Sequence, residues 1–453
     1  MSVYRLILFL FLALAACSQH TKEPSIIARG SERELYAFAG EEHRVHFKAL
    51  YRSSAKRIED LENTSLINDI WETTQFLFGP LTYRGLGGIQ KGEKIQPLLA
   101  QAYIENGRVL VPYDYDATWM IHNSALTDSF LRLPLPFSVA DLKTSHWQDC
   151  TDSADEHGTW GFFWYFWEPK RPGCDHRRNV NFQEIEVEVG IATPQTTESY
   201  PEYARLIHII DGVPTLSMTF AFGYVEEVSR PDPFKDRDTG IKEFQRFYRV
   251  TKEQLLAQSF EESPILQSDI TRGLAIIGSQ FIGIKDGVRV EVSIVAAAGV
   301  DQMDLFAHSY AHNHDGFFGW FGHSRVGSGF DAQNFEYKLK RNSQRYSLTS
   351  DYQLVYWAGC NSYSYYTLPF FNLKAQLNPE TDPQGTRNLD LISNTLPSLF
   401  IFNAANAQVL FQALIQWKKP TSYQSIIQKI EKIADSRGAL VIVNVLGDED
   451  NQH

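Results

Sequence analysis

The sequence has no excess of basic residues, few cysteines and no long apolar run after its first residues. Of its 453 residues, 42 are Lys or Arg and 54 are Asp or Glu, so the formal net charge is −12. A general nucleic-acid binder needs a basic surface to neutralise phosphates, and this composition provides none. We therefore expect no nucleic-acid partner. Since no later segment has 18 consecutive apolar residues, we also expect no membrane-spanning helix beyond the N-terminus.

The composition is otherwise that of a globular protein. Hydrophobic residues make up 43% of the chain and charged residues 21%, which excludes collagen, coiled coil and wholesale disorder. The length exceeds that of one ordinary domain, so two are expected. Aromatic residues reach 13%, and aromatic rings pack well on pleated sheets, so the composition favours strands.

The first residues have the pattern of an export signal. Arg5 precedes an apolar run that is too short to cross a bilayer as a helix. The run ends in Leu14-Ala15-Ala16-Cys17, which resembles the bacterial lipobox, so residues 1–16 would be a signal peptide and Cys17 would carry a lipid. The alternative is an ordinary secretory signal cleaved near the same place. Polar residues 17–30 are expected to form a tether.

The resemblance to lipoproteins also implies a location. In Gram-negative lipoproteins an Asp directly after the lipidated Cys retains the protein in the inner membrane, and here that residue is Ser18. The resemblance therefore implies an outer-membrane lipoprotein, on either the periplasmic or the surface face.

Exported proteins tend to pair their cysteines. Cys150 and Cys174 lie 24 residues apart in one segment, and a disulfide between them is expected. Two alternatives are a zinc site that also uses His157 and His176, and two free thiols. Cys360 would then remain unpaired, as a buried inert residue, an intermolecular cysteine or a reactive thiol.

Residues 31–260 are expected to form a β-rich α+β domain. Residues 182–190 alternate strictly between apolar and acidic side chains, which predicts a half-buried strand. Asn106 and Gly107 predict a tight hairpin turn. Short helices are predicted over 55–66 and 251–262.

Residues 265–453 are expected to form an α/β domain with a mostly parallel sheet flanked by helices. Apolar runs predict buried strands over 288–298, 316–324, 351–360 and 439–446. Helices are predicted over 397–417 and 422–435, the second with Ser422 as a possible cap. Strands that alternate with helices indicate a parallel sheet covered on both faces.

Two of the predicted strands end in residues that carry chemistry. The run 316–324 ends in Gly322-His323, and the run 351–360 ends in Gly359-Cys360. In open parallel sheets, catalytic groups gather at the carboxyl ends of strands, so these two side chains would meet if the strands are neighbours. A thiol attacks a carbonyl carbon as the thiolate, and an imidazole can accept its proton.

This layout resembles the caspase–gingipain–legumain clan of cysteine peptidases, in which one strand ends in Gly-His and a later strand ends in a small residue and Cys. The strings FGHSRVGSG, WAGCNSYSYY and GTRNLDLISNTL resemble a bacterial group of caspase-like lipoproteins, over roughly residues 285–450. The resemblance implies that His323 is the general base and proton donor and that Cys360 is the nucleophile. It also implies a peptide or protein substrate, no cofactor, and an oxyanion hole of backbone N–H groups near Ser324 and Cys360.

One position departs from the clan. The clan usually has Gly directly after the His, whereas this chain has Ser324. A backbone N–H survives this change, but the geometry of the loop need not stay the same. The alternative function is a catalytically inactive binding or scaffold lipoprotein that retains the fold.

Other residues near the expected site have weaker interpretations. Asn361, Ser362 and Asp390 either shape a substrate pocket or serve as packing and capping residues. The histidines at 308, 312, 314 and 323 suggest a metal-binding protein as a further alternative, although no HExxH motif accompanies them.

Overall fold

The computed structural model describes residues 34–90, 92–126, 130–143, 146–151, 163–196, 198–226, 231–269, 274–298, 315–324 and 349–447. The expected signal peptide and tether, with Cys17 and Ser18, lie outside these residues, as do His157, His308, His312 and His314. Residues 33–453 form one compact unit.

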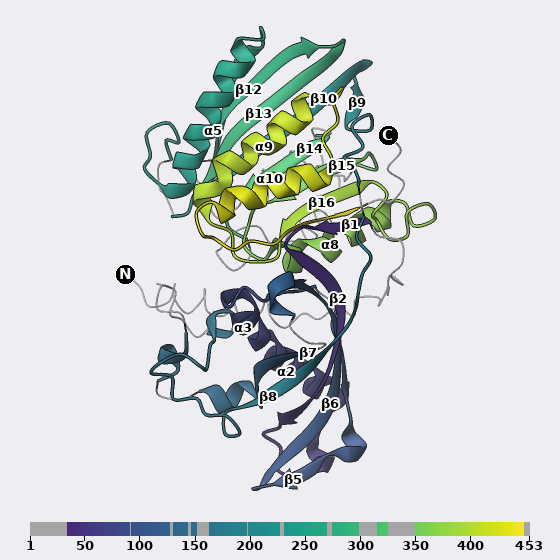
Figure 1. The fold of residues 1–453 in the computed structure, drawn as a ribbon, viewed down its shortest axis with the longest axis vertical. Helices are drawn as coiled ribbons and strands as arrows, with labels where there is room; N and C mark the ends of the chain where they lie inside the picture. Colours follow the sequence, from purple (N-terminus) through teal and green to yellow (C-terminus); the bar gives the residue numbers. More distant parts are fainter. Residues whose placement is uncertain are drawn as a thin grey trace. The chain divides into compact units, whose positions relative to one another are not determined.

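The described residues form two β-sheets and the helices that pack on them (Figure 1). The helices are α2 (Asn63–Thr74), α3 (Phe78–Tyr83), α4 (Phe163–Phe166), α5 (Thr239–Leu256), α8 (Ser362–Leu377), α9 (Asn403–Ile415) and α10 (Tyr423–Asp435). The expected division into a mixed α/β sheet and a β-rich part is confirmed at this level.

The larger sheet, called here the mixed sheet, has ten strands. They are β1 (Glu34–Ala37), β9 (Ile207–Ile210), β10 (Val213–Gly223), β11 (Glu261–Asp269), β12 (Leu274–Lys285), β13 (Val288–Ala298), β14 (Phe317–Phe321), β15 (Gln353–Trp357), β16 (Leu389–Asn394) and β17 (Val443–Gly447). Five of them, in the order β13-β10-β14-β15-β16, run parallel in the middle. Antiparallel strands flank this parallel block on both sides.

The smaller sheet is a curled antiparallel sheet of seven strands. They are β2 (Gly40–Arg52), β3 (Gly87–Ile89), β4 (Lys94–Pro97), β5 (Tyr103–Glu105), β6 (Arg108–His122), β7 (Phe130–Pro136) and β8 (Phe182–Ala192). β8 contains the alternating segment, so that prediction is confirmed. Asn106 and Gly107 adopt positive φ angles of 50° and 75° in the turn from β5 to β6, as a tight hairpin requires.

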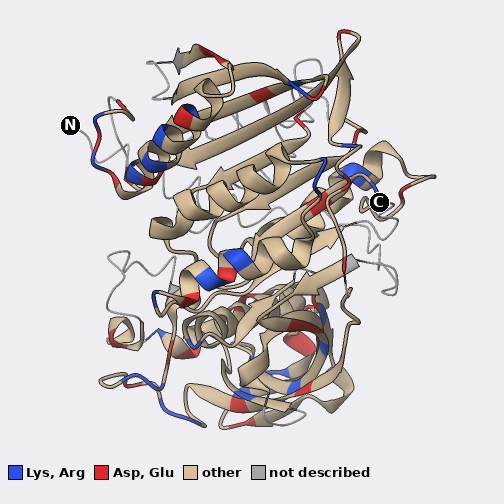
Figure 2. Ribbon diagram, turned by 45° about the horizontal axis from the view of Figure 1, so that its top comes forward, with Lys and Arg blue, Asp and Glu red and all other residues tan. Residues whose placement is uncertain are grey.

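Helices cover both faces of the mixed sheet, as the predicted strand-helix alternation requires. α5, α9 and α10 pack on one face, with buried residues such as Phe220, Phe411 and Ile430. α9 contains no charged residue and lies between α5 and α10, both of which carry charged residues (Figures 1 and 2). α8 packs on the other face, where Tyr366 and Phe370 contact Trp357 of β15.

The antiparallel sheet contacts the α8 face directly. Met120 of β6 belongs to the hydrophobic cluster on this face. The hydroxyl of Tyr363 in α8 donates a hydrogen bond of 2.7 Å to the Glu42 carboxylate of β2. The two sheets are therefore parts of one packed unit.

The expected domain boundary near residues 260–265 is corrected by the strand order. β9, β10 and α5 precede this boundary but belong to the mixed sheet, and β10 is one of its central strands. The chain changes sheets between the end of β8 at Ala192 and the start of β9 at Ile207. Local composition and periodicity could not indicate this crossing, because strand pairing between distant segments leaves no local mark in the sequence.

Several predicted elements also shift. The helix predicted over 55–66 is wrong, since α2 begins at Asn63, and residues 261–262 of the predicted 251–262 helix belong to strand β11. The prediction over 422–435 is confirmed as α10, where the Ser422 side chain accepts a hydrogen bond from the backbone N–H of Ser425. The predicted helix 397–417 begins only at Asn403, and residues 395–402 instead form a loop and a short 3₁₀ turn.

Candidate active site

The register of two neighbouring strands brings His323 and Cys360 to the same edge of the sheet. β14 and β15 are adjacent and parallel, and residues 317–320 of β14 each pair with the residue 37 positions later, from Phe317 with Leu354 to Trp320 with Trp357. His323 and Cys360 are also 37 residues apart, and they follow these strands at equivalent positions. The backbone N–H of Ala358 donates to the Trp320 carbonyl at 2.8 Å, which completes the last pair of this register, Trp320 with Trp357.

Gly359 lets the two strand ends approach closely. A Cβ atom at this position would lie 3.1 Å from the amide nitrogen of Ser324 and 3.2 Å from the carbonyl oxygen of Gly322. These residues flank His323 on both sides. The peptide that precedes Cys360 therefore contacts the segment that carries the imidazole, and only a residue without a side chain fits there without displacing a neighbour.

Cys360 is a free cysteine, partly exposed at the carboxyl edge. Its sulfur accepts a hydrogen bond from the Ser398 backbone N–H at 3.4 Å, and its S–H lies 3.7 Å from the Ser398 carbonyl oxygen. Burial of the sulfur raises the pKa of the Cys360 thiol, and the backbone hydrogen bond with Ser398 offsets part of this increase. The resting group at neutral pH is therefore a thiol and not a thiolate.

The His323 imidazole is partly exposed and packs against an aromatic ring. The Phe400 ring lies edge-on to it, with ring centroids 4.9 Å apart. The Trp320 indole N–H donates to the His323 carbonyl oxygen at 3.0 Å, which fixes the backbone at the end of β14. Phe400 lies in the loop after β16, and its neighbours Leu399 and Ile401 are 48% and 41% exposed. The surface beside the thiol and the imidazole is therefore apolar.

Ser324 occupies the position at which the resemblance implies an oxyanion-binding N–H. Its side chain is buried, and its hydroxyl has no hydrogen-bond partner among the described residues. Its amide nitrogen faces the peptide of Gly359 and Cys360 at close range. Two backbone N–H groups, of Ser324 and Cys360, therefore lie within one small region at the edge of the sheet.

Asn361 and Ser362 do not line a pocket, which corrects the expectation for them. Both are completely buried. Asn361 has a left-handed backbone (φ 50°), donates from its side-chain amide to the Thr395 carbonyl at 2.8 Å, and accepts from the Tyr165 hydroxyl. The Ser362 hydroxyl donates to the Trp357 carbonyl at 2.8 Å and accepts from the Asn394 N–H at 2.7 Å. Both residues join α8 to the strand ends.

Asp390 lies at the opposite edge of the sheet from Cys360. It pairs with Leu354 near the start of β15, six residues before Cys360, or about 20 Å along the strand direction. It is completely buried and accepts hydrogen bonds from the hydroxyls of Tyr352 and Tyr423. It therefore supports the fold and cannot reach a substrate at the thiol.

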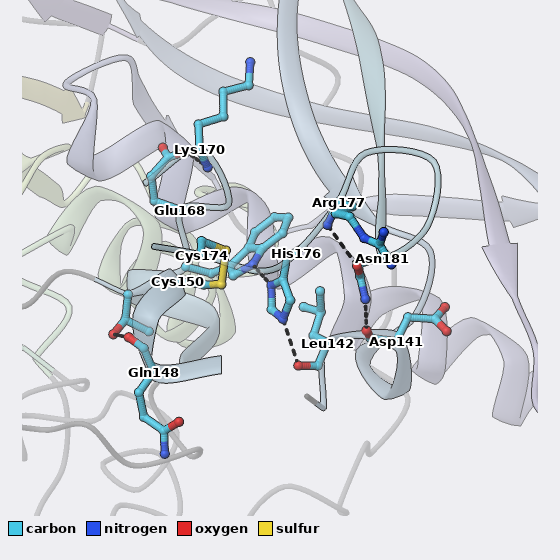
Figure 3. The surroundings of a disulfide bond; sticks show 12 residues. Asp141, Leu142, Gln148, Cys150, Glu168, Lys170, Cys174, His176, Arg177 and Asn181 are labelled. Atoms are coloured by element: carbon cyan, nitrogen blue, oxygen red, sulfur yellow. Dashed lines mark hydrogen bonds between the residues drawn. A yellow bond between two sulfur atoms is a disulfide. The ribbon is translucent and has the colours of Figure 1, made fainter. Parts of the chain in front are cut away.

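Cys150 and Cys174 form the expected disulfide (Figure 3). The His176 ring lies beside it, and these three residues are the group of possible metal ligands found among the described residues. Both sulfurs are consumed by the disulfide, however. Nδ1 of His176 accepts from the Trp167 indole N–H at 3.1 Å, so Nε2 carries the proton and donates to the Leu142 carbonyl at 3.0 Å. Burial lowers the pKa of His176, which keeps the ring neutral.

Sequence reasoning missed three residues at or near the site. Ser398 and Phe400 contact Cys360 and His323, but the predicted helix 397–417 covered their loop. The rule that functional groups follow parallel strands would have indicated this loop, because it follows β16. Tyr165 reaches Asn361 from a segment some 200 residues earlier, and no signal in the sequence indicates this contact.

Comparison of the chain with protein-family models, with curated proteins and with solved structures finds no match. Among the residues that the structure describes, no helix combines the length and apolar character needed to cross a membrane.

Proposed function

We propose that the carboxyl edge of the mixed sheet is the active site of a caspase-like cysteine peptidase, with Cys360 as nucleophile and His323 as general base. The observation that carries the proposal is the shared 37-residue offset, by which two adjacent parallel strands end in an imidazole and a free thiol at equivalent positions. The contact of Gly359 with both neighbours of His323 supports it. The resemblance of these strand ends to the caspase–gingipain–legumain clan supplies the reaction.

The raised pKa of Cys360 indicates the order of events. Because the resting sulfur is a thiol, His323 would accept its proton as the sulfur attacks the carbonyl carbon of the scissile peptide. The new C–S bond displaces the carbonyl π electrons onto oxygen, and the N–H groups of Ser324 and Cys360 would stabilise this oxyanion. His323 then returns the proton to the leaving amine as the C–N bond breaks. Water hydrolyses the resulting thioester and regenerates the thiol.

The expected lipid anchor completes the proposal. The lipobox-like residues support a lipoprotein attached through Cys17 to the outer membrane, with the catalytic unit on a short tether. Replacement of Cys17 with Ser would then abolish incorporation of labelled fatty acid, whereas unchanged labelling would contradict the anchor.

A second function is favoured by one observation. The elevated pKa of Cys360 also suits a buried inert cysteine, in a non-catalytic envelope lipoprotein that binds or organises other components. The two functions differ in whether the thiol reacts with a peptide carbonyl with the help of His323.

The test is labelling by an irreversible thiol-directed peptide probe. Wild type should be labelled at Cys360, Cys360→Ala should not be labelled, and His323→Ala should be labelled at least about 100-fold more slowly, as for loss of a general base. His46→Ala, which removes a partly exposed histidine of the antiparallel sheet, is the matched control and should behave as wild type. Equal labelling of wild type, Cys360→Ala and His323→Ala would favour the non-catalytic alternative.

A further inference from the structure

The antiparallel part of the molecule contacts the candidate site through one buried hydrogen bond. The Tyr165 hydroxyl donates to Oδ1 of Asn361, the residue directly after Cys360. Both side chains are buried, at 4% and 0% exposure. A buried polar pair of this kind is costly to break, so Tyr165 restrains the Asn361 side chain.

Asn361 in turn holds the loop that covers the thiol. Its side-chain amide donates to the Thr395 carbonyl at 2.8 Å, and its backbone N–H donates to the Leu396 carbonyl at 3.3 Å. Two residues further along this loop, Ser398 contacts the Cys360 sulfur with both its N–H and its carbonyl group. Tyr165 is therefore linked to the sulfur through Asn361 by two routes, the chain itself and the loop.

Aromatic stacking reinforces this contact. The Phe78 ring of α3 lies roughly parallel to the ring of Tyr165, with centroids 6.5 Å apart, and to the ring of Tyr365 in α8, at 6.3 Å. α8 begins at Ser362, immediately after Asn361. The same helix that starts at the site is thus packed against the Tyr165 ring through Phe78.

The disulfide fixes the segment that carries Tyr165. The backbone N–H of Glu168 donates to the Cys150 carbonyl at 2.7 Å, and Trp167 forms a β-bridge with Thr151. The Trp167 ring is buried in a small cluster with Cys150. Its indole N–H donates to His176, which lies next to the disulfide (Figure 3). Cross-linking Cys150 to Cys174 therefore immobilises the backbone two residues from Tyr165.

We infer that Tyr165 is a positioning residue for Cys360, acting through Asn361, and that the Cys150–Cys174 disulfide holds Tyr165 in place. This inference rests on the proposed function, because it assigns to the antiparallel part of the chain the control of the thiol proposed as nucleophile. Without the Tyr165 hydroxyl, Asn361 and the 395–398 loop relax. The sulfur then becomes easier for a small reagent to reach but is less well aligned for a peptide.

The experiment measures two rates of modification at Cys360 in the full chain, by mass spectrometry of the peptide that contains it. One reagent is iodoacetamide and the other is the peptide probe. Tyr165→Phe should raise the iodoacetamide rate and lower the peptide-probe rate, each by about fivefold, the size of one net hydrogen bond. Replacing both Cys150 and Cys174 with Ala should change both rates in the same directions.

Tyr51→Phe is the matched control. It removes a hydroxyl that donates to Asp69 at 3.3 Å within the antiparallel part. The variant therefore loses one comparable hydrogen bond that has no link to Cys360. Both of its rates should stay within about twofold of wild type, since one hydrogen bond lost elsewhere does not touch the thiol. Equal effects of Tyr51→Phe and Tyr165→Phe would show a general loss of stability and would overturn the inference.

A second variant tests the route through Asn361. Asn361→Gly keeps the left-handed backbone accessible but removes the acceptor of the Tyr165 hydrogen bond. In this background, adding Tyr165→Phe should have no further effect on the iodoacetamide rate. An additive effect would overturn the inference. If wild type fails to react with the peptide probe, the proposed function fails, while the iodoacetamide rates still decide whether Tyr165 controls the thiol.

Discussion

The two edges of the mixed sheet both carry polar and titratable side chains, yet they differ in access to solvent. At the carboxyl edge, Cys360 and His323 are partly exposed beside an apolar rim. At the amino edge, Asp390 and Lys374 are completely buried and bonded to other groups of the protein. The difference shows that a polar residue next to a strand is a candidate for chemistry only where a substrate can approach it.

The amino edge is held together by a buried polar network. The Lys374 ammonium in α8 donates to the carbonyl oxygens of Thr349 and Asp351 and to the Gln353 side chain, at 2.8–3.0 Å. Gln353 donates to the Asp315 carbonyl at 2.9 Å. Burial lowers the pKa of Lys374 to about 7. Such a network ties the starts of β14 and β15 to α8, which leaves their carboxyl ends free to form a site.

The largest expected effect breaks the amino edge. Asp390→Ala leaves two buried tyrosine hydroxyls without their acceptor, so the free energy of unfolding should fall by roughly 2–6 kcal/mol, at 1–3 kcal/mol for each group. Cys360→Ala should change the free energy of unfolding by less than about 1 kcal/mol, because Cys360 is a small residue that is partly exposed. Urea unfolding of both variants measures this. A stable Asp390→Ala variant that fails to react with the peptide probe would contradict the assignment of Asp390 to the fold.

The second prediction concerns pH. Burial raises the pKa of Asp315 from 3.8 to about 7, so the folded protein holds this proton more tightly than the unfolded chain. The contribution of the protonated Asp315 carboxyl to the free energy of unfolding is fully present below pH 3.8 and is lost as the pH rises to about 7. From pH 4 to 7, wild type should therefore lose on the order of 2–4 kcal/mol relative to Asp315→Asn, since one pKa unit is worth about 1.4 kcal/mol.

Urea unfolding at both pH values tests this difference. Asp286→Asn, which alters an exposed carboxylate, is the control and should follow wild type. Parallel pH curves for wild type and Asp315→Asn would show that Asp315 is ionised in the folded protein.

The smallest effect on stability is expected from Gly359→Ala at the carboxyl edge. The new methyl group would crowd the Ser324 amide at 3.1 Å, which costs about 1 kcal/mol but displaces the proposed oxyanion-binding N–H. Peptide-probe labelling should therefore fall by about tenfold or more, which is less than the roughly 100- to 1,000-fold effect of removing an oxyanion donor because the N–H is displaced and not lost. Gly40→Ala is a crowded control far along the chain, with a contact of 2.9 Å to Ile442. Similar labelling of both variants would remove Ser324 from the proposed site.

Local patterns predicted those elements whose burial is periodic. β8 and α10 follow from alternation and from a row of isoleucines, because each element buries one regular face. The helix predicted over 251–262 is present only to Leu256, because residues 261–262 pair as an edge strand with β12, and pairing partners decide such segments. The same limit explains the misplaced domain boundary, since the residues of β10 pair with residues 74 and 99 positions later in β13 and β14.

The candidate site was predicted in part. His323 and Cys360 could be named because each follows an apolar strand, and adjacent parallel strands bring such residues to one edge. For Asn361, Ser362 and Asp390 the sequence left a pocket role and a packing role open, because exposure cannot be read from residue type when a polar side chain satisfies its hydrogen bonds internally. Ser398 and Phe400 were missed because their segment was predicted as the start of a helix. Their residue types do not distinguish a loop at a site from a first helical turn.

The sequence by itself determined the periodic strands and helices, the pair of cysteines available for a disulfide, and the identities of the thiol and imidazole at two strand ends. Tertiary structure alone decided which strands are neighbours, which polar groups are sealed from solvent, and that Tyr165 reaches the residue beside the thiol. The physical reason is that hydrophobic periodicity and turn chemistry act over a few residues, whereas strand pairing and burial depend on segments that are distant in the chain.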